Sequence, residues 1–160
     1  PVSLKLLLYK TLVRTKLEYA GSIWNPGVSL ASSIESIQNR SARFILSNYH
    51  RTASVTSMKA SLYLPNLSSR RKIARLCLFH KIYHSNPALR TSLFSEPSYI
   101  SPRTDHPLKV GIPYCITSTF YASFLPLTSV DWNRLPASVA SLTDAADFKT
   151  AITDVFNNVP

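Results

Sequence analysis

Glycine, cysteine and acidic residues are scarce in this sequence. Three glycines in 160 residues leave no phosphate-binding loop of the P-loop or dinucleotide type, because such loops need several glycines. Two cysteines, Cys77 and Cys115, exclude a disulfide scaffold and a four-cysteine zinc site, and they fit a reducing compartment. The leucine run at residues 6–8 is far too short to span a bilayer. The chain begins at Pro1 without a methionine, so we expect it to be a piece of something longer.

Positive charge is abundant and unevenly placed. The chain has 18 Lys and Arg against eight Asp and Glu, a net charge of +10. Residues 1–103 hold 15 basic and three acidic side chains, a net of +12, whereas residues 104–160 hold three and five, a net of −2. This asymmetry favours a basic lobe that faces nucleic acid, with a roughly neutral appendage. We expect no membrane partner, because no helical stretch divides sharply into basic and apolar faces.

Residues 62–84 predict the helix around which the rest of the chain is organised. Pro65 fixes the approach, Asn66 can accept hydrogen bonds from the first free N–H groups, and Leu67 opens the helical run. Apolar residues on several sides predict that its C-terminal half is packed from several directions. The residues at three- and four-residue spacing on one face are Ile73, Leu76, Cys77, His80, Tyr83 and His84.

Other segments also have helical period. They are residues 2–19, a segment from residue 29 or 32 to 47, a short segment that Ser54 can cap, and a last helix after Thr143 or Asp144. In the first, Leu4, Leu7, Leu8, Leu12 and Tyr19 lie along one side; the stripe of the second is Leu30, Ile34, Ile37, Ser41, Phe44 and Ile45; and Phe148, Ile152, Val155 and Phe156 face inward in the last.

The C-terminal third has a different texture. Residues 85–107 are rich in Pro and Ser with little periodicity, which predicts a connection. Residues 108–116 and 118–128 are typical of two short, irregular strands, which their prolines would confine to an edge. We therefore expect a mainly α fold: a helical region over residues 1–84, the connection at 85–107, and a small α+β extension at 108–160.

Cations crowd the first turns of the helix that begins at Leu67. Near a helix N-terminus they oppose the macrodipole, at a cost of about 0.3–1 kcal/mol each when exposed. Such a cluster predicts a partner that supplies negative charge, and nucleic-acid phosphate is the first candidate; an ordinary solvated helix face is the alternative. With basic residues of the preceding helix and loop, the candidate nucleic-acid-binding set is Arg40, Arg43, Arg51, Arg70, Arg71, Lys72 and Arg75.

Other candidate sites are weaker. Cys77, His80 and His84 have a spacing that could offer three zinc ligands on one helix face, but they lie on the apolar stripe, so we expect packed core residues and no metal site. Trp24 and Trp132 could stack on bases, but each follows an apolar residue at a turn, which favours anchoring in a core. No nucleophile has the sequence context of a hydrolase, and we expect no catalytic residue and no cofactor in this segment.

Short motifs follow one another along nearly the whole chain. The first part has Tyr9–Ala20 (YKTLVRTKLEYA), Ile23-Trp24-Asn25-Pro26, Ile37–Ile45 (IQNRSARFI), Tyr49–Thr56 (YHRTASVT), Leu64-Pro65 and Arg70–Leu76 (RRKIARL), and the last part has Phe124-Leu-Pro126 and Asp131–Pro136 (DWNRLP). In this order they resemble the region just after the polymerase palm in jockey-like non-LTR retrotransposon reverse transcriptases. Three positions depart from the family pattern: Thr15 replaces a usual Pro, and Leu125 and Leu127 replace a common Phe and Arg.

The resemblance implies a thumb-like helical region with a post-thumb extension in an RNA-directed DNA polymerase. It implies RNA and DNA, as template and primer, and the upstream palm as partners. It also implies an intracellular location, nuclear if the parent element is active. The family's paired metal-binding aspartates would lie upstream of Pro1, and the parent polymerase would use Mg²⁺. Two-metal phosphoryl transfer needs clustered carboxylates, so we expect this segment to be inactive alone. The alternative is a degenerate or repurposed fragment that serves as a helical protein-interaction module.

Overall fold

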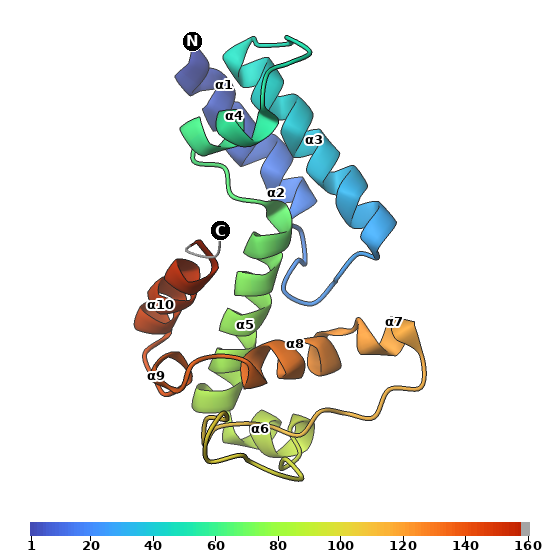
Figure 1. The fold of residues 1–160 in the computed structure, drawn as a ribbon, viewed down its shortest axis with the longest axis vertical. Helices are drawn as coiled ribbons and strands as arrows, with labels where there is room; N and C mark the ends of the chain where they lie inside the picture. Colours follow the sequence, from blue (N-terminus) through green and yellow to red (C-terminus); the bar gives the residue numbers. More distant parts are fainter. Residues whose placement is uncertain (158–160) are drawn as a thin grey trace. The chain divides into compact units, whose positions relative to one another are not determined.

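The computed structural model describes residues 1–157, and within this range all regular secondary structure is helical (Figure 1). The predicted mainly α fold is therefore confirmed. The end of the expected C-terminal extension, residues 158–160, lies outside the described residues. Along the chain the elements are α1 (Val2–Leu8), the π-helix η1 (Tyr9–Val13), α2 (Arg14–Leu17), α3 (Val28–Leu46), α4 (Val55–Ser61), α5 (Leu67–Ser85), α6 (Pro87–Leu93), α7 (Ser118–Tyr121), α8 (Phe124–Asn133), α9 (Ala137–Ala140) and α10 (Ala145–Asn157).

The chain forms two compact units. The first comprises residues 1–21 and 26–71, and the second comprises residues 22–25 together with the chain from residue 72 onward. The residues of α5 before Lys72 thus belong to the first unit, and the rest of that helix belongs to the second. The Pro-rich residues 85–107, which the sequence suggested as a connection, lie within the second unit.

In the first unit, α1, η1 and α2 form one continuous helical stretch that lies beside α3 (Figure 1). The amide N–H of Arg14 donates to the carbonyl of Tyr9, five residues earlier, so the turn there is wider than in an α-helix. Tyr9 enters the core, whereas α1 has no buried residue. The core of this unit consists of Tyr9, Ala42, Ile45, Met58, Leu62 and Leu64.

Two predicted helix starts are confirmed, and one gains an unexpected partner. The Ser54 hydroxyl accepts from the Ser57 N–H at the start of α4. α5 begins at Leu67 as predicted, and the Leu67 N–H donates to the Glu35 carboxylate at 3.0 Å. Asn66, the expected cap, accepts a hydrogen bond from the Lys59 ammonium through its side-chain oxygen at 2.7 Å. Glu35 on α3 therefore anchors the start of α5.

The second unit is built around Trp132, whose side chain is fully buried. The indole N–H donates to the carbonyl of Leu108 at 2.8 Å, and the ring lies 5.1 Å from the Phe79 ring and 5.9 Å from the Phe148 ring between centroids. As predicted, Asp144 caps α10 by accepting from the N–H groups of Ala146 and Asp147. The inward face of α10 is also confirmed, because Phe148 and Ile152 lie in the core and Val155 and Phe156 pack against it.

The two predicted strands are wrong. Residues 108–116 are irregular, and residues 118–128 contain α7 and the start of α8. Pro126 lies in the first turn of α8, where a missing N–H costs little. Val110, in the irregular segment, makes both of its main-chain hydrogen bonds with the side-chain amide of Asn133, the last residue of α8, at 2.9 and 2.8 Å. A side chain thus takes the place of a neighbouring strand.

The predicted connection also contains a helix, α6, that the sequence analysis missed. Its signal was present, because Asn86 precedes Pro87 and a Pro is favoured in the first turn. The Asn86 side chain accepts from the Leu89 N–H at 3.0 Å.

Candidate nucleic-acid interface

Arg70, in the first unit, is engaged with a carboxylate of its own chain. Its guanidinium binds both oxygens of Glu18, through Nε and, at 3.0 Å, through Nη2. The hydrogen bond to Glu18 raises the pKa of Arg70 above its ordinary value, against the opposing effect of burial. Glu18 also lies 3.9 Å from Arg14, the i,i+4 pair that the sequence suggested.

Arg71, the next candidate, is 3% exposed. It passes close to the main chain of Gly21, where an added Cβ would lie only 3.1 Å from Arg71 Cγ and 3.0 Å from the Glu18 carbonyl oxygen. The absence of a side chain at Gly21 therefore leaves the space that the Arg71 stem occupies. In this structure the Arg71 side chain is not on the surface for a phosphate to reach.

Lys72 and Arg75, in the second unit, share the carboxylate of Asp131. The Lys72 ammonium lies 2.9 Å from Oδ1, and Nη2 of Arg75 lies 3.0 Å from Oδ2. Arg75 also donates to the Asn25 side chain at 3.2 Å, and Lys72 lies 4.6 Å from the centroid of the Phe156 ring. Arg75 is 5% exposed, so its charge is directed inward.

The other three candidates belong to the first unit and have different environments. Arg43 donates to the carbonyls of His50 and Ala53 at 3.1 and 3.5 Å, so it holds the loop after α3. Arg40 on α3 and Arg51 in that loop are exposed, and no hydrogen bond or ion pair of their side chains occurs among residues 1–157. The structure therefore leaves Arg40 and Arg51 open to solvent, and Lys16 of α2, which the sequence analysis did not single out, shares this property.

Of the three α5 residues with zinc-ligand spacing, His80 lies in the packed interior, whereas Cys77 and His84 are half-buried. His80 is fully buried, its Nε2 lies 2.6 Å from the carbonyl oxygen of Leu142, and its ring stacks on Phe148 at 4.1 Å. Burial raises the pKa of the Cys77 thiol. Burial, with His80 and Arg90 nearby, lowers the pKa of His84. Residues 1–157 contain no group of three or more His, Cys, Asp or Glu side chains that could hold a metal ion.

The two tryptophans have different fates. Trp132 anchors the core of the second unit, as expected. Trp24, for which we also expected a buried position, is 45% exposed. It lies in the irregular segment between α2 and α3, where no helix periodicity directs the side chain inward.

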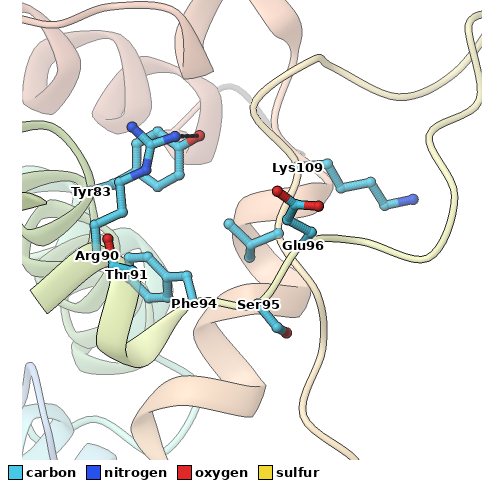
Figure 2. Close-up of a pocket in the computed structure, with 8 residues that line it drawn as sticks. Tyr83, Arg90, Thr91, Phe94, Ser95, Glu96 and Lys109 are labelled. Carbon is cyan, nitrogen blue, oxygen red and sulfur yellow. Dashed lines mark hydrogen bonds between the residues drawn. The ribbon is translucent and has the colours of Figure 1, made fainter.

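The second unit has a surface depression of about 290 Å³ (Figure 2). The guanidinium of Arg90 lies over the Tyr83 ring at 4.1 Å and donates to its hydroxyl at 3.0 Å, while Lys109 is bound to Asp105 at 2.8 Å. The residues that line it are Tyr83, Arg90, Thr91, Phe94, Ser95, Glu96, Lys109 and Val110.

Comparison with known proteins found no family model, curated protein or solved structure that matches this chain. Among residues 1–157, none of the helices combines the length and apolar character that crossing a membrane requires.

Proposed function

We propose that this chain is a non-catalytic C-terminal segment, thumb and post-thumb, of a non-LTR retrotransposon reverse transcriptase. Its first unit would contact the template–primer duplex. The ordered motifs from Tyr9 to Pro136 support the proposal, and so does the helical structure within residues 1–84, for which the resemblance implies a thumb-like helical region. Polymerisation itself would require the aspartates and Mg²⁺ of the palm, which the resemblance places in another segment.

The observation that carries this proposal is the charge of the first unit. Residues 1–21 and 26–71 hold ten Lys and Arg but only two acidic residues, Glu18 and Glu35, a net of +8. Both carboxylates are already bound to cations, Glu18 to Arg70 and Glu35 to Lys59. The first unit therefore has eight more basic than acidic side chains. Such a surface attracts phosphates by counterion release, without reading base sequence.

The candidate cations differ in whether a phosphate could reach them. Arg71 and Arg75 are buried and Arg43 holds a loop, so these side chains support the fold. Arg40, Arg51 and Lys16 are exposed cations, and no carboxylate within residues 1–157 pairs with them. In the proposed role their long side chains contact backbone phosphates and leave the base edges unread.

The test is the salt dependence of binding to an RNA–DNA hybrid duplex. Arg40→Gln combined with Arg51→Gln should weaken binding to all sequences by a similar factor. Each lost phosphate contact should lower the slope of log K against log salt by about one. The matched control is Arg103→Gln with Lys149→Gln, two exposed cations of the second unit, which should leave the slope unchanged. An unchanged slope in the folded Arg40 and Arg51 variant would reject the proposed contact surface.

A second candidate function is a helical protein-interaction module. The observation that favours it is the apolar side of α1 and η1, where Leu4, Leu7, Leu8 and Leu12 are all exposed. Apolar helix stripes normally face a core, and contiguous exposed ones mark interaction surfaces.

A further inference from the structure

The first unit exposes an apolar helix face on a protein surface that is otherwise strongly basic. Of the apolar residues along α1 and η1, only Tyr9 is buried, whereas Leu12 is 63% exposed and Leu7 is 57% exposed. These leucines are surface residues of a well-formed helix, so folding of this unit does not require them to be leucine. An apolar side chain in water is unfavourable by roughly 25 cal/mol for each Å² exposed, which favours burial against a partner.

A groove runs along this face, between the first helical stretch and α3. Its volume is about 160 Å³. An apolar protein cavity of roughly 150 Å³ accepts benzene, so this groove has room for one large apolar side chain. Leu8, Leu12 and Val13 form one wall, and Phe44 and Ile45 of α3 form the other, with Tyr9, Lys5 and Ser41 completing the lining.

One cation lies in the lining of the groove, and two more lie within about a helical turn of its lining residues. Lys5 lies in the lining, with its ammonium 4.7 Å from the centroid of the Phe44 ring, and it donates only to the Phe44 carbonyl and the Ser47 hydroxyl. Arg40 precedes Phe44 by one helical turn, and Lys16 follows Leu12 by about one turn, so both flank the groove. No carboxylate neutralises any of these three charges in the described part of the chain.

These charges decide between the possible occupants. A second copy of the chain would bring the same basic unit, with its net charge of +8, against the first, and like charges across an interface are repulsive. Nucleic acid would satisfy the cations but would leave the leucines without apolar contacts. A helix with apolar residues on one face and carboxylates beside them satisfies both features.

We propose that the groove between α1–η1 and α3 binds an acidic amphipathic helix of a partner protein. One large apolar side chain of that helix would enter the groove between Leu12 and Phe44, and apolar neighbours on the same face of the partner helix would lie on the exposed leucines beside it, as in helix-in-groove recognition. Flanking Asp and Glu side chains would meet Lys5, Lys16 and Arg40. This inference does not rest on nucleic-acid binding, although Arg40 and Lys16 take part in both proposals, and it specifies the partner of the second candidate function.

The probes are two synthetic helical peptides with identical apolar positions, one with Glu at the flanking positions and the other with Lys. The Glu peptide should bind the full chain at least tenfold more tightly than the Lys peptide, and part of its affinity should survive high salt because the apolar contacts remain. Equal affinities of the two peptides, or no binding of the Glu peptide, would overturn the proposal.

Variants place the binding on the groove. Leu8→Ser with Leu12→Ser should lower the affinity for the Glu peptide by about tenfold or more, while the affinity for the duplex stays unchanged. Ile116→Ser, at an apolar position of the second unit that is 85% exposed, is the matched control and should have no effect. Lys16→Glu with Arg40→Glu tests the charges without touching the apolar wall and should reverse the preference between the peptides. Circular dichroism checks that each variant is folded. Self-association of the wild type that the leucine variant abolishes would instead make a second copy the occupant.

Discussion

Arg75 and Asp131 form a buried ion pair in the second unit, with Nη2 of the arginine 3.0 Å from Oδ2 of the aspartate. Asp131 lies in α8, 56 residues along the chain from Arg75 in α5, and it also binds Lys72. The cations near the start of α5 predicted an outside source of negative charge. Asp131 and, in the first unit, Glu18 supply that charge from within the chain for Lys72, Arg75 and Arg70.

Replacing Asp131 with Asn should destabilise the second unit. The change leaves the Arg75 guanidinium buried without a counter-ion, and loss of one partner of a buried pair costs about 3–5 kcal/mol. The measurement is urea unfolding followed by tryptophan fluorescence, because Trp132 lies in the core of the second unit and Trp24 belongs to the same unit. Asp154→Asn, at an exposed position of α10, is the control and should leave the free energy of unfolding within about 0.5 kcal/mol of wild type. Equal midpoints for the two variants would show that the pair contributes nothing.

Ionisation of Tyr9 should lower the stability of the first unit at alkaline pH. Its hydroxyl donates to the buried Gln38 side chain at 2.8 Å, and burial raises its pKa to about 12. Between about pH 10, the ordinary tyrosine pKa, and pH 12, the unfolded chain loses the Tyr9 proton while the folded chain keeps it. Stability is therefore present below pH 10 and is lost as the pH rises through this window.

Tyr9→Phe separates the two contributions of this residue. Near pH 7 it should lower stability by about 1–3 kcal/mol, because the Gln38 oxygen loses its donor in a buried site. Between pH 10 and 12 the variant should lose less stability than wild type, so the gap between them should narrow. Unfolding midpoints at pH 8 and pH 11 test this, with Tyr49→Phe, at an exposed position, as the control. A gap that is constant with pH would contradict the proposed ionisation.

Helices were predictable from this sequence where local signals determine them. The start of α5 at Leu67 and the Asp144 cap of α10 follow from caps and apolar spacing within a few residues. The prediction of strands was wrong because the hydrogen-bond partner of Val110 is the Asn133 side chain, 23 residues away. A β-prone composition cannot distinguish that partner from a neighbouring strand. The exposed side of α1 is equally non-local, since it depends on which surfaces α3 and α4 leave uncovered.

The candidate site shows the same limit. Charge counts pointed to the first turns of α5, but they could not show that Glu18, 52 residues from Arg70, binds its guanidinium. Arg71 and Arg75 look like surface cations in the sequence because such side chains are rarely buried unless they are paired. Spacing along one helix reports which residues share a face; it does not report which carboxylate from a distant helix meets that face.

His84 should make the second unit sensitive to acid. Burial is the main cause of its lowered pKa, followed by His80, whose ring centroid is 4.5 Å away, and Arg90. Below about pH 6.5, the ordinary histidine pKa, the unfolded chain takes up a proton that the folded chain resists. The stabilising contribution is therefore present above pH 6.5 and is lost as the pH falls through the folded-state pKa. His84→Gln should flatten the pH profile of Trp132 unfolding below pH 6.5, whereas His50→Gln, in the first unit, should not. A parallel profile for wild type and His84→Gln would argue against this coupling.

At position 63, glycine should give a more stable protein than alanine. It follows α4 with a φ of +52°, the left-handed region that costs residues with a Cβ roughly 1–2 kcal/mol. The N–H of Tyr63 donates to the carbonyl of Ala60 and that of Leu64 to the carbonyl of Lys59, which is the helix-ending pattern that favours glycine at this position. The Tyr63 side chain is 86% exposed, so its removal loses few packing contacts.

Tyr63→Gly should therefore be more stable than Tyr63→Ala by about 1 kcal/mol in thermal or urea unfolding of the first unit. Ala60→Gly, inside α4, gives the opposite sign for a similar change, a loss of about 1 kcal/mol, because there the glycine only adds backbone freedom to the unfolded chain. If glycine were the less stable residue at both positions, the left-handed conformation of Tyr63 would not be a source of strain.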